Sequence, residues 1–178
     1  MPFDIRPLAP DDATVDALAQ ILIDTVAAGG SVHFMHPVGR DEAAGYWREA
    51  LADAARGGRI VLGAFEDGAL KGTVTLWLDT PPNQPFRGEI WKLMTAPAAR
   101  GRGVASALMA EAERLAAVHG RILLNLDTAV EGGAASLYER LGWRKAGEIP
   151  DYAYKPHGGT VGTAIYFKRL PPRIAPAA

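Results

Sequence analysis

The sequence predicts an α/β fold with a central twisted, mixed and mostly antiparallel sheet of about seven strands and about four helices. Three observations lead to this class. Two helical patterns follow the first short strand, a hairpin signal stands at Asp67-Gly68, and a strand, a glycine loop and a helix follow one another around Gly101. The expected element order is β-α-α-β-β-β-α-β-α-β-β.

Each element has its own local signal. Apolar or alternating runs of strand length predict strands over residues 3–6, 59–65, 71–78, 89–95, 121–128, 143–149 and 160–169. Asp11 is available as an N-cap for a first helix that ends at Gly29-Gly30. Further helices are expected over 41–55, from Val104 onward and over 134–141, and a loop is expected over 150–159. Residues 1–170 should form a single domain, and residues 171–178 a flexible tail.

Composition excludes several function classes. The chain has 178 residues, a formal net charge of −1 and no cysteine. A near-neutral charge gives no electrostatic reason to bind nucleic acid or an anionic membrane surface. Without cysteine there is no disulfide, thiol nucleophile or cysteine-based zinc site. The sequence has no signal-peptide pattern, so a soluble cytoplasmic protein, monomeric or homodimeric, is expected.

The glycine loop has the features of an anion-binding site. Gly101 and Gly103 let the backbone approach a ligand closely, because they have no Cβ. The helix that follows presents unpaired N–H groups and the positive end of its dipole, which together bind phosphate well. Arg100 and Arg102 add full positive charges.

Two known patterns fit this loop. The spacing G-x-G-x-x-S, with Ser106 in place of the third glycine, approaches a dinucleotide-binding fingerprint, and Asp127 stands near the position of a ribose-binding acid. The second pattern is R-x-x-G-x-A after a strand and a proline, and Pro97, Arg100, Gly103 and Ala105 match it.

The second pattern, together with the downstream run ASLYERLGW over 135–143, resembles the GNAT family of acyl-CoA-dependent N-acetyltransferases. The resemblance implies the GNAT fold and an enzyme that transfers acetyl from acetyl-CoA to a primary amine within a ternary complex, without a metal. It also implies which residues bind the co-substrate. The pantetheine arm would meet Leu93, Met94 and Thr95, and the pyrophosphate would meet Arg100, Gly101, Arg102, Gly103, Val104, Ala105 and Ser106.

The resemblance also implies catalytic roles. Tyr138 would protonate the leaving thiolate, although its position beside Leu137 also suits a half-buried core aromatic. Glu89 would act as the base that deprotonates the amine, directly or through water, or it is a solvated residue at the start of a strand. Asp127 is the second candidate base, or a carboxylate that caps a loop. Glu131 stands where many members have a CoA-contacting asparagine, so that contact is expected to be lost or replaced.

The acceptor side is expected between two loops. The predicted substrate-binding residues are Ser31, His33, Phe34, His36, Tyr152 and Tyr154. The two histidines could share a metal ion, but the sequence offers no third ligand, so no metal site is expected. The segments 124–128, 147–152 and 163–168 are similar to the GNAT branch that contains tabtoxin-resistance acetyltransferases, which acetylate a small amino-acid-like antibiotic.

These observations predict an N-acetyltransferase that acts on a small, amino-acid-like or toxin-like amine. Two alternatives stay open. The chain could acetylate the N-termini of proteins or peptides, or it could be a module that binds CoA or a nucleotide without catalysis.

Overall fold

The computed structural model describes residues 3–171. Their strands form one seven-stranded sheet in the order β1-β2-β3-β4-β5-β7-β6. The strands are β1 (Asp4–Pro7), β2 (Arg59–Glu66), β3 (Ala69–Trp77), β4 (Arg87–Thr95), β5 (Leu123–Ala129), β6 (Arg144–Tyr154) and β7 (Thr160–Arg169). The helices are α1 (Asp12–Ala27), α2 (Arg40–Ala55), α3 (Val104–Val118) and α4 (Ala134–Arg140). The predicted fold class and element order are confirmed. The predicted flexible tail lies outside the described residues apart from Pro171.

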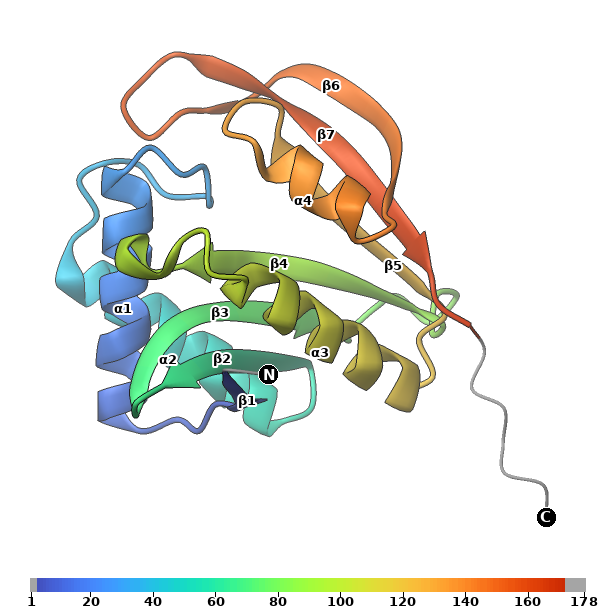
Figure 1. Ribbon diagram of the computed structural model, residues 1–178, viewed down its shortest axis with the longest axis horizontal. Helices are drawn as coiled ribbons and strands as arrows, with labels where there is room; N and C mark the ends of the chain where they lie inside the picture. Colours follow the sequence, from blue (N-terminus) through green and yellow to red (C-terminus); the bar gives the residue numbers. More distant parts are fainter. Residues whose placement is uncertain (1–2, 172–178) are drawn as a thin grey trace.

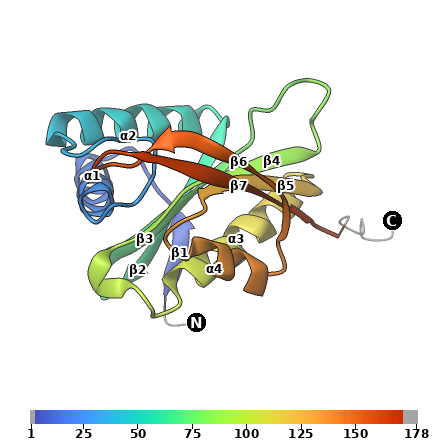
Figure 2. The same ribbon diagram turned by 90° about the horizontal axis from the view of Figure 1, so that it is seen from above.

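Helices cover both faces of the sheet. Figure 2 shows α1 and α2 on one face and α3 and α4 on the other. One apolar core, which includes Leu62, Leu108 and Leu124, lies under α3 and α4, and a second, which includes Leu22 and Trp47, lies under α1 and α2. Because both faces are buried, Thr73 and Thr75 of β3 are fully covered although their hydroxyls are polar. The Thr73 hydroxyl donates to the backbone oxygen of Leu62 at 2.8 Å.

The sheet divides between β4 and β5, which are its one parallel pair of strands. Every other neighbouring pair is antiparallel, whereas β4 and β5 run parallel and pair only at Arg87–Leu123, Gly88–Leu124 and Glu89–Asn125. Beyond Asn125 the two strands separate, as Figure 1 shows. The separation leaves space inside the sheet at the carboxyl ends of both strands, where the glycine loop and α4 also lie.

The prediction of a loop over 150–159 is wrong for its first half. Strand β6 continues through Pro150 to Tyr154, with a register shift against β7 between Ile149 and Ala153. Proline lacks the N–H that a central strand needs, but β6 is the edge strand of the sheet and pairs with β7 alone. The irregular register at this edge therefore accommodates Pro150 without ending the strand.

No helix within residues 3–171 is both long enough and apolar enough to span a bilayer. The cytoplasmic location expected from the sequence stays a prediction.

We expect Gly72→Ala to destabilise the fold, because a Cβ at Gly72 would lie 2.8 Å from the Met94 backbone oxygen and 2.8 Å from Val104 Cγ1. Overpacking of this kind costs about 1–3 kcal/mol. Gly45→Ala in α2 is the matched control, since its Cβ meets nothing within 4 Å. That change should stabilise the helix by about 0.5–1 kcal/mol. Urea unfolding of both variants measures the difference, and equal free energies of unfolding would contradict the packing at Gly72.

Candidate functional site

Two cavities meet at the buried side chain of Tyr138. The larger, of about 580 Å³, lies against the glycine loop and the start of α3. The smaller, of about 230 Å³, lies between the loop after α1 and the end of β5. Both cavities are lined by the same five residues at their junction: Thr25, Leu93, Gly132, Ala134 and Tyr138. A molecule in one cavity can therefore reach a molecule in the other beside the Tyr138 ring.

The larger cavity has the geometry of an anion cradle. Gly101 and Gly103 have φ angles of 75° and 87°, which favour glycine, and a Cβ on either would meet no atom of residues 3–171 within 4 Å. Among the described residues, no side chain caps the N-terminus of α3. Within residues 3–171, no described backbone bond to a preceding residue uses the N–H groups of Val104, Ala105 or Ser106. These groups face a cavity that Arg100 and Arg140 also line.

Nearly all of the predicted co-substrate residues line this larger cavity. They are Leu93, Met94, Thr95, Arg100, Gly101, Gly103, Val104, Ala105 and Ser106. Arg102 does not, because its guanidinium forms two hydrogen bonds with Glu66, at 2.5 and 2.9 Å. Sequence reasoning missed Arg140, which stands two residues after Tyr138 and supplies a second cation to the cavity.

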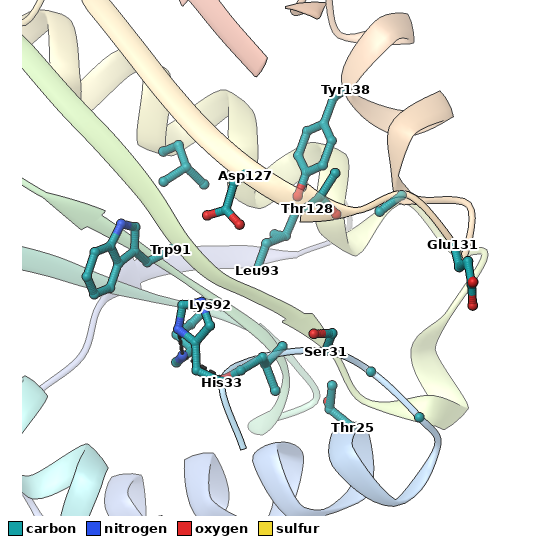
Figure 3. A pocket seen from close by; sticks show the side chains of 16 residues that line it. Thr25, Ser31, His33, Trp91, Lys92, Leu93, Asp127, Thr128, Glu131 and Tyr138 are labelled. Atoms are coloured by element: carbon teal, nitrogen blue, oxygen red, sulfur yellow. Dashed lines mark hydrogen bonds between the residues drawn. The ribbon is translucent and has the colours of Figure 1, made fainter. Parts of the chain in front are cut away.

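Tyr138 is held so that its phenol stays protonated. The side chain is 6 % exposed and its ring packs beside Trp143 and Tyr166. Burial and, to a smaller extent, the negative charge of Asp127 together raise the pKa of Tyr138 to about 12. Figure 3 shows the ring reaching from α4 toward Asp127 and Leu93. The Tyr138 phenol is therefore protonated at neutral pH, and the residue lines both cavities.

Asp127 is a carboxylate that is accessible from the smaller cavity. It is the fifth residue of β5, where the strand has already separated from β4, and its side chain is exposed. One oxygen accepts a hydrogen bond from the Thr163 hydroxyl at 2.9 Å. No ion pair engages Asp127 within residues 3–171. Its charge is therefore available to a cation in the cavity.

Glu89 lies in a different environment. It is ion-paired with Arg87, and its second oxygen accepts from Trp91 Nε1 at 2.8 Å. Partial burial pushes the pKa of Glu89 up, but the hydrogen bonds from Arg87 and Trp91 outweigh this effect and hold the pKa below its usual value. Glu89 lines neither cavity at Tyr138 and instead borders a shallow pocket that it shares with Asp127.

The predicted substrate residues fall into two groups. Ser31 and His33 line the smaller cavity, and Tyr152 joins them in an adjoining pocket. The other three lie elsewhere: Phe34 packs against Tyr46, His36 faces His157, and Tyr154 is 70 % exposed at the end of β6. Within residues 3–171, no three histidine or carboxylate side chains gather as metal ligands would.

Lys92 is a site residue that the sequence pattern did not reveal. It stands at a bulge of β4 with a φ of 53° and is 8 % exposed, although it borders the smaller cavity. Its Nζ donates to the Val32 backbone oxygen at 2.7 Å and contacts His33 Nδ1 at 3.0 Å (Figure 3). Burial lowers the pKa of Lys92 to about 8, while the charge of Asp127 opposes the shift. A lysine in the middle of an apolar strand was the only local signal.

The fold is shared by solved structures of acetyltransferases. The yncA protein of Salmonella typhimurium, solved with its cofactor acetyl-CoA, is 19 % identical over 100 % of this chain and 99 % of its own, with a TM-score of 0.78. A phosphinothricin acetyltransferase from Sinorhizobium meliloti, in complex with acetyl-CoA, is 21 % identical over 96 % and 89 %, with a TM-score of 0.78. A ribosomal-protein-alanine N-acetyltransferase from Brucella melitensis is 22 % identical over 94 % and 99 %, with a TM-score of 0.78.

These identities establish the shared fold and nothing finer, so the tabtoxin-resistance branch stays a prediction. Family membership rests on the sequence itself. Residues 30–143, which include the glycine loop and Tyr138, match the model of the acetyltransferase (GNAT) family. The chain belongs to the GNAT family of acetyltransferases.

Proposed function

We propose that this acetyltransferase moves the acetyl group of acetyl-CoA to the primary amine of a small, amino-acid-like or toxin-like molecule, by direct attack in a ternary complex. One observation carries the proposal: Tyr138 lines both the cavity of the glycine loop and the smaller cavity that Asp127 borders. Acetyl-CoA and the acceptor amine would therefore meet beside the Tyr138 phenol, which can donate a proton. Binding both molecules side by side makes a bimolecular reaction effectively unimolecular and lowers its barrier.

The larger cavity suits acetyl-CoA. The free N–H groups at the start of α3, with Arg100 and Arg140, would hold the pyrophosphate. The segment Leu93–Thr95 would receive the pantetheine arm on an apolar wall that Leu137 completes. Acetyl-CoA supplies the acetyl thioester. The residues that line the cavity would hold the thioester near Tyr138 and exclude water from it.

Asp127 is our candidate for the base. The amine must lose a proton before it attacks, and for an amine of pKa ~10.4 the neutral form at pH 7 costs ~4.6 kcal/mol. Asp127 is accessible from the smaller cavity, here called the acceptor cavity, and none of the ion pairs within residues 3–171 involves it. Glu89, in contrast, is ion-paired with Arg87 and accepts a hydrogen bond from Trp91. A role for Glu89 would need a water between it and the amine.

Tyr138 completes the proton balance. A bond forms between the amine nitrogen and the acetyl carbon, and the bond between that carbon and sulfur breaks. The ammonium first loses one proton through Asp127 to bulk water, so Asp127 is a carboxylate again when the neutral nitrogen attacks. The second nitrogen proton then passes to Asp127, the Tyr138 hydroxyl donates a proton to the departing thiolate, and Asp127 returns its proton to the tyrosinate. Because the pKa of Tyr138 is raised to about 12, the phenol keeps its proton at neutral pH and regains it readily after each turnover.

The size of the acceptor cavity supports a small molecule over a peptide. Its volume of about 230 Å³ is below the range of roughly 300–1,000 Å³ typical of drug-sized ligand sites. A protein N-terminal amine is the alternative acceptor. Side-by-side assays of thiol release with single amino acids and with tetrapeptides distinguish the two, and faster turnover of tetrapeptides would overturn the small-molecule assignment.

The first variant we would measure is Tyr138→Phe. Loss of the proton donor should lower kcat roughly 100-fold or more, while acetyl-CoA binding is retained. Acetyl-CoA at 100 times its Kd should raise the free energy of unfolding of both proteins by about 2.7 kcal/mol, and NAD should not. In the wild type, ionisation of Tyr138 should cause no fall in kcat up to pH 10, because a phenol of pKa about 12 remains protonated there.

Tyr166→Phe is the matched control, since this buried phenol donates to Glu139 and lines neither cavity. A fall in kcat shared equally by both variants would count against Tyr138 as the donor. Absence of both acetyl-CoA protection and thiol release from any amine would overturn the proposed function itself.

The choice of base is tested by Asp127→Asn against Glu89→Gln. We expect Asp127→Asn to lower kcat/KM roughly 100-fold, because the amide cannot accept the amine proton. Glu89→Gln should have the smaller effect, since Glu89 lies outside the acceptor cavity. Steady-state thiol release with one amine measures both. The reverse ranking would move the base to Glu89.

A further inference from the structure

His33 lines the acceptor cavity and is in contact with the buried Lys92. Its Nδ1 lies 3.0 Å from Lys92 Nζ. An ammonium group has three donors and no acceptor, so the shared hydrogen must belong to Lys92 and Nδ1 must be the acceptor. A neutral imidazole with a bare Nδ1 carries its proton on Nε2. The contact with Lys92 therefore leaves His33, a residue that lines the cavity, with one hydrogen-bond donor, at Nε2.

The surroundings keep Lys92 charged and His33 neutral. The ammonium donates to the Val32 backbone oxygen and lies 5.5 and 5.2 Å from the ring centres of Phe34 and Tyr46, close enough for cation–π attraction. With a pKa of about 8, Lys92 is mostly protonated at pH 7. Burial and the charge of Lys92 lower the pKa of His33, so that a second proton on its ring is disfavoured.

We propose that His33 and Lys92 form a subsite that binds a carboxylate of the acceptor molecule. The His33 Nε2–H, polarised by the ammonium behind it, would donate to a carboxylate oxygen. The buried Lys92 ammonium has a third N–H for which no partner is described within residues 3–171. Hydrogen bonds to charged groups in such a partly dry site are among the strongest in proteins.

The opposite charge lies in the same cavity. Asp127 and Glu131 both line the cavity that His33 and Lys92 border. Glu131 is ion-paired with Lys155 at 3.4 Å, so Asp127 is the carboxylate that balances the Lys92 ammonium across the cavity. That pattern complements a zwitterion, whose ammonium would approach Asp127 while its carboxylate would approach His33. The inference rests on the proposed function and narrows it: the acceptor is a small free amino acid, and simple amines or amino-acid amides are poorer substrates.

The test compares each amino acid with its own amide in the wild type, His33→Phe and His33→Gln. Phenylalanine keeps a ring but has no donor, whereas the glutamine amide nitrogen can replace Nε2–H. His33→Phe should lower kcat/KM for the acid roughly 10- to 100-fold relative to the amide, mainly through KM. His33→Gln should restore most of the preference. Comparing ratios between proteins cancels the different amine pKa values of acid and amide.

His119→Gln controls for loss of a histidine, because His119 only caps the end of α3. The second readout is ¹⁵N NMR of histidine-labelled enzyme, in which His33 should show the neutral Nε2–H tautomer at pH 7. Lys92→Met removes the hydrogen-bond donor to Nδ1, so the Nε2–H tautomer should no longer be favoured. The same change should raise the His33 pKa toward its ordinary value. A protonated or Nδ1–H His33 in the wild type would overturn the subsite, whether or not Lys92→Met folds.

Failure of this inference is distinct from failure of the proposed function. Equal effects of His33→Phe on acids and amides, with thiol release intact, would remove the carboxylate subsite and leave the acetyltransferase assignment standing. No thiol release from any amine would remove the proposed function, while the tautomer measurement would still report on the Lys92–His33 contact.

Discussion

The separation of β4 from β5 is the constraint on which the rest of this structure depends. The two strands pair over three residues and then diverge just after Glu89 and Asn125, whose side chains Arg87 joins through its guanidinium. The hydrogen bond from Arg87 to Asn125 links β4 to β5 at the end where the two strands are paired. At the open end, the glycine loop, α4 and the loop after α1 enclose two cavities that meet at Tyr138. A fully paired sheet would leave no space for these two cavities.

A bulge in β4 determines what the open end contains. Thr73 and Thr75 of β3 pair with Met94 and Trp91, so the bulge lies between those two pairs. Lys92 adopts a positive φ there, a conformation that is uncommon for residues other than glycine and carries strain of about 1–3 kcal/mol. The packing of the two cores on either side of the sheet stabilises the fold enough to offset this strain. At this bulge the Lys92 ammonium contacts Val32 in the loop after α1, while Leu93 lines both cavities.

Burial acts in opposite directions on the two titratable groups at this centre. It raises the pKa of Tyr138 and lowers that of Lys92, because a low-dielectric environment disfavours the charged form of each. For Tyr138 the result is a protonated phenol that can donate. Lys92 keeps its charge at neutral pH with the help of a carbonyl, an imidazole and two aromatic rings. Among the acids, Glu89 is engaged by neighbouring donors and Asp127 is left to the cavity.

Local sequence determined the element order, the glycine loop and Tyr138, because periodicity, turn residues and the motif around residues 135–143 act over short stretches of chain. It did not determine which way longer side chains turn. Arg102 pairs with Glu66, 36 residues away in sequence, while Arg140 turns into the larger cavity. Strand β6 passes through Pro150 only because it is an edge strand, and Lys92 meets Val32 and His33 only because of the β4 bulge. Register and edge position are set by contacts between distant segments, so only the tertiary structure decided them.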